Sequence, residues 1–144
     1  MNSWWNNKTA WASVVIVFAF FVLFNFFWNE WLLADWYAAT ADMWEAPSYS
    51  TNLLMLGLLW MAVAFTWIWT VGYENKGTWE GVRYGWFIAA LMTGPLLVAH
   101  SWQAWPSQLV GWWLLGLWVE FSIAGWLLAW AYDAKGQWHG WLRG

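Results

Sequence analysis

Residues 109–132 read LVGWWLLGLWVEFSIAGWLLAWAY, and this stretch decides the fold class. Its 24 residues are enough for a helix that crosses the ~30 Å hydrocarbon layer of a bilayer, because each residue adds ~1.5 Å. Its one acidic or basic residue is Glu120, near the middle. A carboxylate at that depth costs ~2.5 kcal/mol or more. We therefore expect Glu120 to face protein and to be protonated, paired or hydrogen-bonded.

The composition extends this conclusion to the whole chain. Of the 144 residues, 62% are hydrophobic and only 9% are charged, so too few polar side chains exist to cover a water-soluble globule. Three further apolar stretches, at about 11–33, 53–72 and 81–101, are long enough to span a membrane. The sequence predicts an all-α, multi-pass membrane protein in which residues 1–144 form one domain of four antiparallel transmembrane helices.

The basic residues indicate how these helices are oriented. The five are Lys8, Lys76, Arg83, Lys135 and Arg143. All fall on one side of the predicted spans, and the positive-inside rule then places both termini in the cytoplasm, with the chain in a bacterial inner membrane. The net charge of −3 without a basic run argues against nucleic acid as a partner, and the absence of cysteine excludes disulfides and thiolate metal sites.

Tryptophan is the most unusual feature of the composition, with 21 residues. An aromatic belt at the two membrane interfaces accounts for many of them. Trp60, Trp67, Trp118 and Trp126 lie deeper in the predicted spans. We expect these to pack against protein, with contact to a flat pigment or cofactor as the alternative.

Two stripes of small residues with four-residue spacing mark the third and fourth spans. The first is Gly81, Gly85, Ala89 and Thr93, and the second is Gly116, Glu120 and Ala124. Residues four apart stack on one face of a helix, and small side chains there let another backbone approach closely. We predict that Gly81, Gly85, Ala89, Gly116 and Ala124 form helix-packing contacts.

Three polar residues are expected at a similar depth, namely Asn25, Thr93 and Glu120. They lie near a predicted kink at Pro95, which frees the carbonyl of Leu91 because proline has no N–H. Such an intramembrane polar layer is either a structural hydrogen-bond cluster that holds the helices in register or a proton relay or ligand site.

A second polar group, Asn29, Glu30 and His100, is expected near the outer face. Histidine and carboxylate can bind a metal, and a histidine can ligate a tetrapyrrole, but two such residues are far from a complete ligand shell. The sequence therefore favours a hydrogen-bonding interfacial histidine and no metal site. At the cytoplasmic turn, Glu80 and Arg83 are three apart at a helix start and are predicted to form an ion pair.

The stretch WEGVRYG at 79–85, together with NEWLL at 29–33 followed by Tyr37, resembles small four-helix inner-membrane proteins of bacteria. The resemblance implies the fold and supplies no activity. The tryptophan content is also similar to that of the tryptophan-rich sensory (translocator) proteins, but those have five spans and this chain has four.

No phosphate-binding loop, Ser/His/Asp set, HExxH or paired-carboxylate motif is present in the sequence. We therefore expect a structural or accessory subunit of a larger bacterial membrane complex, photosynthetic or respiratory, that stabilises assembly through tryptophan-rich helix surfaces. Its partners are then membrane lipids and other membrane-protein subunits. The first alternative is a small carrier or receptor for a lipid, quinone or tetrapyrrole near Glu120, and the second is a membrane enzyme that uses Glu120 or His100. No cofactor is required, and contact with a pigment, quinone or lipid stays open.

The orientation can be tested with fusions. A reporter that works only in the cytoplasm should be active after Gly144 and inactive within the linker 102–108, because these positions lie on opposite sides of the predicted bundle. Activity of a periplasm-only reporter after Gly144 contradicts the predicted topology.

Overall fold

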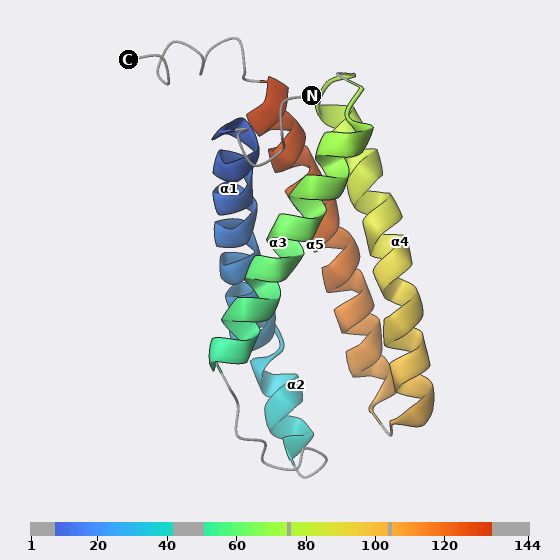
Figure 1. The fold of residues 1–144 in the computed structure, drawn as a ribbon. Coiled ribbons are helices and arrows are strands. Elements are labelled where there is room, and N and C mark those ends of the chain that lie inside the picture. Colours follow the sequence, from blue (N-terminus) through green and yellow to red (C-terminus); the bar gives the residue numbers. More distant parts are fainter. Residues whose placement is uncertain (1–7, 42–50, 75, 104, 134–144) are drawn as a thin grey trace.

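The computed structural model describes residues 8–41, 51–74, 76–103 and 105–133 (Figure 1). Every regular element in these ranges is a helix. In chain order they are α1 (Lys8–Asn25), the π-helix η2 (Phe26–Leu32), α2 (Ala34–Ala39), α3 (Thr51–Gly72), α4 (Thr78–Trp102) and α5 (Ser107–Asp133). Two of the basic residues used to predict the orientation, Lys135 and Arg143, lie outside the described residues, as does His139.

Four helical segments are long and apolar enough to cross a membrane. They are Lys8–Leu32, Thr51–Gly72, Thr78–Trp102 and Ser107–Tyr132. Each is rich in Leu, Val, Ile, Phe and Trp and carries few charges. In a membrane such a helix places its apolar side chains in hydrocarbon and satisfies its own backbone N–H and C=O groups. The prediction of an all-helical chain with four potential transmembrane helices is thus confirmed, and it indicates a multi-pass membrane protein.

The structure shows three local features beyond the predicted spans. The first span changes from α-helix to π-helix at Phe26, and the short helix α2 follows this span. At Pro95, where the sequence predicts a kink, α4 continues through the proline as one helix. Proline removes one N–H donor, and the remaining backbone hydrogen bonds of a long helix can carry it past one such defect.

The core is centred on three phenylalanines from three different helices. Phe21 of α1, Phe65 of α3 and Phe121 of α5 are each at most 3% exposed. Their ring centroids lie 5.4 to 6.0 Å apart, with tilted or edge-to-face rings. These are favourable aromatic geometries, so the cluster joins α1, α3 and α5 by more than their buried area alone.

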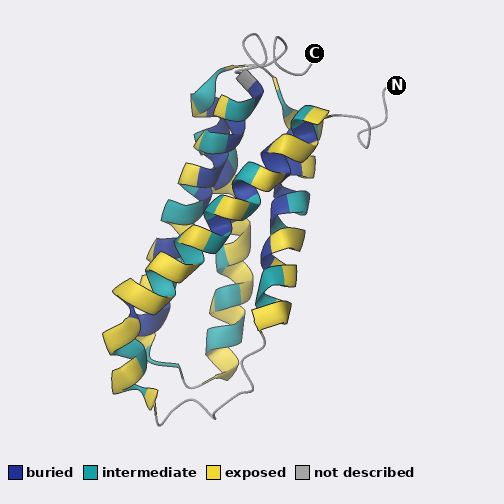
Figure 2. Cartoon of the chain, turned by 90° about the vertical axis from the view of Figure 1, so that its left-hand side faces the viewer, coloured by how far each residue is buried: buried dark blue, intermediate teal, exposed yellow. Residues whose placement is uncertain are grey.

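Burial is concentrated toward one end of the bundle (Figure 2). All the buried residues of α4 lie in its first half, between Glu80 and Ala89, and those of α1 lie between Ala10 and Phe21. The π-helix η2 has no buried residue. The end that contains η2 and the second half of α4 is therefore the more loosely packed part of the described bundle.

The tightest contact joins α4 and α5 through glycines. A Cβ atom added to Gly81 would lie 2.0 Å from the carbonyl oxygen of Gly125, and one added to Gly85 would lie 2.0 Å from that of Phe121. Residue numbers rise along α4 while they fall along α5 in these pairs. Only glycine lets the two backbones approach this closely, which is the chemistry expected of small-residue interfaces in membranes.

The other predicted stripe divides between two neighbours. Gly116 does not face α4: a Cβ atom there would lie 2.5 Å from Nε1 of Trp28, on η2. The residues of α5 that meet Gly81 are instead Gly125 and Ala129. Four-residue spacing identifies a face of a helix but not the neighbour that covers it, so the spacing predicts a packing contact at Gly116 without identifying Trp28 as its partner.

Two indole groups also connect α4 and α5. Nε1 of Trp86 donates to Oγ of Ser122 at 3.0 Å, and Nε1 of Trp118 donates to Oγ1 of Thr93 at 3.2 Å. One bond has its donor on α4 and the other has its donor on α5. An indole N–H in a hydrocarbon layer needs an acceptor, so these two tryptophans find one on the facing helix.

The glycine contact leads to a stability prediction. Replacing Gly81 by Ala should reduce the free energy of unfolding by ~1–3 kcal/mol, because the added methyl group must push two backbones apart. Gly94→Ala on the same helix is the matched control, since a Cβ there meets nothing within 4 Å. Unfolding both variants in mixed detergent, followed by circular dichroism, measures the difference. Equal stability of the two variants contradicts the close contact.

Candidate functional site

A cavity of about 180 Å³ lies between the end of α1, the π-helix η2 and the first half of α5. Helix α4 contributes Leu96 to its lining. Its polar or hydrogen-bonding lining residues are Asn25, Trp28, Asn29, Trp113 and Glu120. Tryptophan, asparagine and glutamate around an otherwise apolar space make this the most chemically distinctive hollow among the described residues.

The π-helix positions the wall that faces α5. Its wider turn is visible in the bond from the amide of Leu33 to the carbonyl of Trp28, at 3.0 Å and five residues apart. The Trp28 ring stacks on Phe24, with centroids 5.3 Å apart and an angle of 14°. The indole lies against Gly116, whose missing side chain provides the room. π-helical turns in proteins often occur at functional sites.

Two polar atoms on the cavity residues have no hydrogen-bond partner among the described residues. Nε1 of Trp28 and Oε1 of Glu120 are both buried and unpaired. Gly116, which contacts the Trp28 indole, lies one helical turn before Glu120 on the same face of α5. An unpaired buried polar group costs about 1–3 kcal/mol. Both atoms belong to residues that line the cavity, and each lacks the partner that a buried polar atom normally has.

A chain of hydrogen bonds supports one side of the cavity. Nε1 of Trp113 donates to the Tyr37 hydroxyl at 2.7 Å, and this hydroxyl donates to Oδ1 of Asn29 at 2.8 Å. Nδ2 of Asn29 in turn donates to the carbonyl of Asn25 at 3.2 Å. Burial is the main cause that raises the pKa of Tyr37, the Trp113 bond opposes it, and the charge of Glu30 adds to it. The neutral Tyr37 hydroxyl therefore ties α2 to η2 as a donor and to α5 as an acceptor.

The predicted polar layer is divided in the structure. Asn25 and Glu120 line the same cavity, but Thr93 does not. The Thr93 hydroxyl donates to the carbonyl of Ala89 at 2.9 Å and accepts the Trp118 indole bond. Counting residues from a helix end gives depth in the membrane but not the direction of the side chain, so equal depth did not imply contact.

The outer-face group is also separated. Asn29 lies in the cavity wall, Glu30 is exposed, and His100 is on α4 and does not line the cavity. Nδ1 of His100 is buried without a hydrogen-bond partner in the described part of the chain. The described residues contain no group of three or more His, Cys, Asp or Glu side chains that could hold a metal ion.

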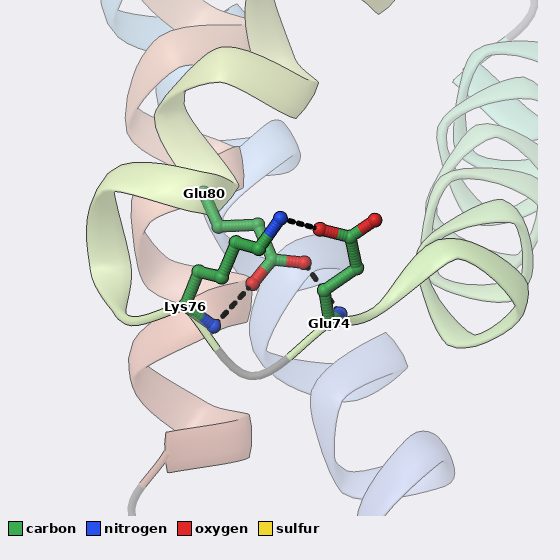
Figure 3. A network of polar contacts seen from close by, with 3 residues as sticks. All are labelled: Glu74, Lys76 and Glu80. Carbon is green, nitrogen blue, oxygen red and sulfur yellow. Dashed lines mark hydrogen bonds and ion pairs between the residues drawn. The ribbon is translucent and has the colours of Figure 1, made fainter.

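At the turn between α3 and α4, Glu80 binds backbone amides and not Arg83. Its two carboxylate oxygens accept from the amides of Glu74 and Lys76, both at 2.7 Å (Figure 3). Lys76 forms an ion pair with Glu74, and this contact is the main cause that lowers the pKa of Glu74. The predicted Glu80–Arg83 ion pair is therefore wrong. The turn folds back over the start of α4, and its unpaired amides take the carboxylate first.

Nothing in the sequence marks Trp28 and Trp113 as site residues. Tyr37 stands out in the sequence only as part of the stretch that resembles small four-helix membrane proteins. Among 21 tryptophans, no spacing distinguishes the two whose indole groups reach the cavity. The one usable signal was the pair Asn25 and Asn29, four residues apart in an apolar span.

Comparison of the chain with protein-family models, curated proteins and solved structures finds no match. The feature that points to a function is therefore the geometry of the cavity.

The environment of Glu120 predicts a difference between two substitutions. Glu120→Gln should keep a folded yield close to that of the original protein, because an amide and a protonated carboxyl offer similar hydrogen bonding. Glu120→Lys should lose ~2.5 kcal/mol or more, since it buries a cation without an anion. Size-exclusion profiles and unfolding in detergent measure both, with the exposed Glu30→Lys as the control. A Lys variant as stable as the Gln variant contradicts burial of Glu120 at membrane depth.

Proposed function

We propose that this protein is a membrane-embedded carrier or receptor for a small uncharged molecule that binds between Trp28 and Glu120. The observation that carries the proposal is the presence of two buried, unpaired polar groups, one donor and one carboxyl, on the residues of one cavity. A ligand with one acceptor and one hydroxyl or second acceptor satisfies both groups. Pairing them recovers about 1–3 kcal/mol for each.

The size and lining of the cavity favour one ligand class. An apolar cavity of ~150 Å³ can hold benzene, so 180 Å³ suits a single ring with its substituents. Because the cavity is partly open to the surface, this volume limits the part of a ligand that lies inside it and not the whole ligand. Of the three ligand classes considered for Glu120, a quinone or quinol head group fits this volume best. Neither Lys nor Arg is among the described residues that line the cavity, which disfavours an anionic lipid head group.

The arrangement in the membrane is part of the proposal. We infer an antiparallel four-helix bundle in a bacterial inner membrane, with both termini in the cytoplasm. It is supported by three basic residues: Lys8 at the start of α1, Lys76 in the α3–α4 turn and Arg83 in the second turn of α4. The start of α1, this turn and the start of α4 lie at the same end of the bundle in Figure 1. The cavity then lies in the opposite, outer half, where burial is lower.

A second candidate is the accessory subunit of a larger membrane complex. It is favoured by large apolar side chains that project from the bundle, with Trp60 of α3 at 73% exposure. Trp67, Trp118 and Trp126, the other tryptophans expected deeper in the spans, are exposed as well. On α5, Trp112 and Trp130 are also exposed, whereas Trp113 is half-buried. Tryptophan prefers the membrane interface to its centre, so a partner protein at Trp60 accounts for its position better than lipid does.

Ligand binding by the purified full chain tests the proposed function. A benzoquinone with a short alkyl tail should bind in detergent, as measured by equilibrium dialysis. Trp28→Phe should weaken binding about tenfold, because it keeps the ring and removes a hydrogen bond worth ~1.4 kcal/mol. Trp118→Phe is the matched control, since its N–H bonds Thr93 outside the cavity.

Equal loss in the two variants contradicts a site at Trp28. If the chain binds no quinone and co-migrates with large subunits in mild detergent, the accessory-subunit candidate replaces the carrier.

A further inference from the structure

A second hollow, of about 230 Å³, lies between α3 and α4 where these helices meet their connecting turn. It is separate from the Glu120 cavity and shares no residue with it. Its apolar walls include Ile68 and Gly72 of α3 and Phe87 of α4. Its polar end is formed by Glu74, Glu80 and Arg83.

The charges at the polar end leave one cation available. The Glu80 carboxylate is occupied by two backbone amides, and the Glu74 carboxylate is paired with Lys76 (Figure 3). Arg83 is exposed, and its charge is a minor cause of the lowered pKa of Glu74, but it forms no ion pair or hydrogen bond with the described residues. A guanidinium group offers five donors in a planar fork that fits phosphate oxygens, so Arg83 is the group at this end that can take an anion.

The position of the groove relates these charges to the membrane surface. α3 ends at Gly72 and α4 begins at Thr78, so the turn between two membrane-spanning helices lies at the level of lipid head groups. Ile68 lies four residues before Gly72 on α3, and Phe87 lies four residues after Arg83 on α4. Each is therefore about 6 Å deeper along its helix than that neighbour. They are 53% and 75% exposed. A molecule that fills this groove therefore meets charge at its head and apolar side chains along its tail.

The groove stays open because α3 and α4 are not packed along their length. α4 has its most extensive contact with α5, and α3 has its most extensive contact with α1. One bond ties α3 to α4 near the groove, from the Tyr84 hydroxyl to the carbonyl of Phe65 at 2.6 Å. Gly72 adds further space, because a Cβ atom there would meet nothing within 4 Å.

We propose that this groove is a binding site for one anionic phospholipid, with the phosphate on Arg83 and an acyl chain along Ile68, Gly72 and Phe87. Arg83 supplies paired donors to the phosphate, and the apolar walls replace lipid contacts along the chain. The site is independent of the proposed carrier function, since it uses different helices and different residues.

Native mass spectrometry of the full chain tests this site. Protein in detergent is mixed with phosphatidylglycerol or with diacylglycerol, which has the same acyl chains but no phosphate, and the bound lipid is counted. Phosphatidylglycerol should be retained at least about fivefold more than diacylglycerol, and Arg83→Gln should remove this preference, since a charge-assisted hydrogen bond changes affinity by about this factor or more. Gly72→Leu should lower the retention of both lipids, because its side chain fills the groove.

Lys8→Gln is the control, because it removes a basic residue at the start of α1 that does not line the groove. Thermal unfolding of each variant confirms that the bundle is intact. Three results overturn the proposal: unchanged lipid preference in Arg83→Gln, unchanged retention in Gly72→Leu, or an equal loss in Lys8→Gln. Glycerophosphate that competes as well as phosphatidylglycerol also overturns it, because it shows a phosphate site without an acyl-chain groove.

Discussion

The backbone contact between Gly81 and Gly125 is the constraint on which the bundle depends. A carbonyl oxygen of one helix lies where a side chain of the other would begin, so α4 and α5 must meet at these glycines and at Gly85. Lipid is as apolar as a leucine side chain, so burial alone provides little force between helices in a membrane. Close packing at glycine, together with the indole bonds of Trp86 and Trp118, supplies the attraction that apolar burial does not.

This contact also explains why the two ends of the bundle differ. The closely packed glycines Gly81 and Gly85 lie in the first half of α4, and the phenylalanine cluster that joins α1, α3 and α5 lies next to them, since Gly85 meets Phe121. Toward the other end, the first span becomes a π-helix and no residue of η2 is buried. A loosely packed region leaves room for a cavity, and the cavity with Trp28 and Glu120 lies there. The closely packed end thus holds the helices together, and the loosely packed end has space for a ligand.

The unpaired polar groups of the cavity residues can be compared with the other polar side chains of the bundle. Several polar side chains of the spans have partners: Thr93 and Ser122 bond indoles and carbonyls, and Tyr84 bonds the Phe65 carbonyl. Others, such as Oγ1 of Thr66 and Nε1 of Trp69, are buried without a partner among the described residues, as are the atoms on Trp28 and Glu120. What distinguishes Trp28 and Glu120 is that an unpaired donor and an unpaired carboxyl oxygen belong to residues that line the same cavity.

The sequence by itself determined the helical class, four segments that can span a membrane, and the small residues at Gly81 and Gly85, because length, hydropathy and four-residue spacing are local properties. Only the tertiary structure decided that Gly116 meets Trp28, that Thr93 leaves the layer of Asn25 and Glu120, and that backbone amides hold Glu80. The first two depend on how helices rotate about their axes, and the third depends on how the α3–α4 turn folds back over the start of α4. That rotation is set by packing between distant segments, and no local pattern records it.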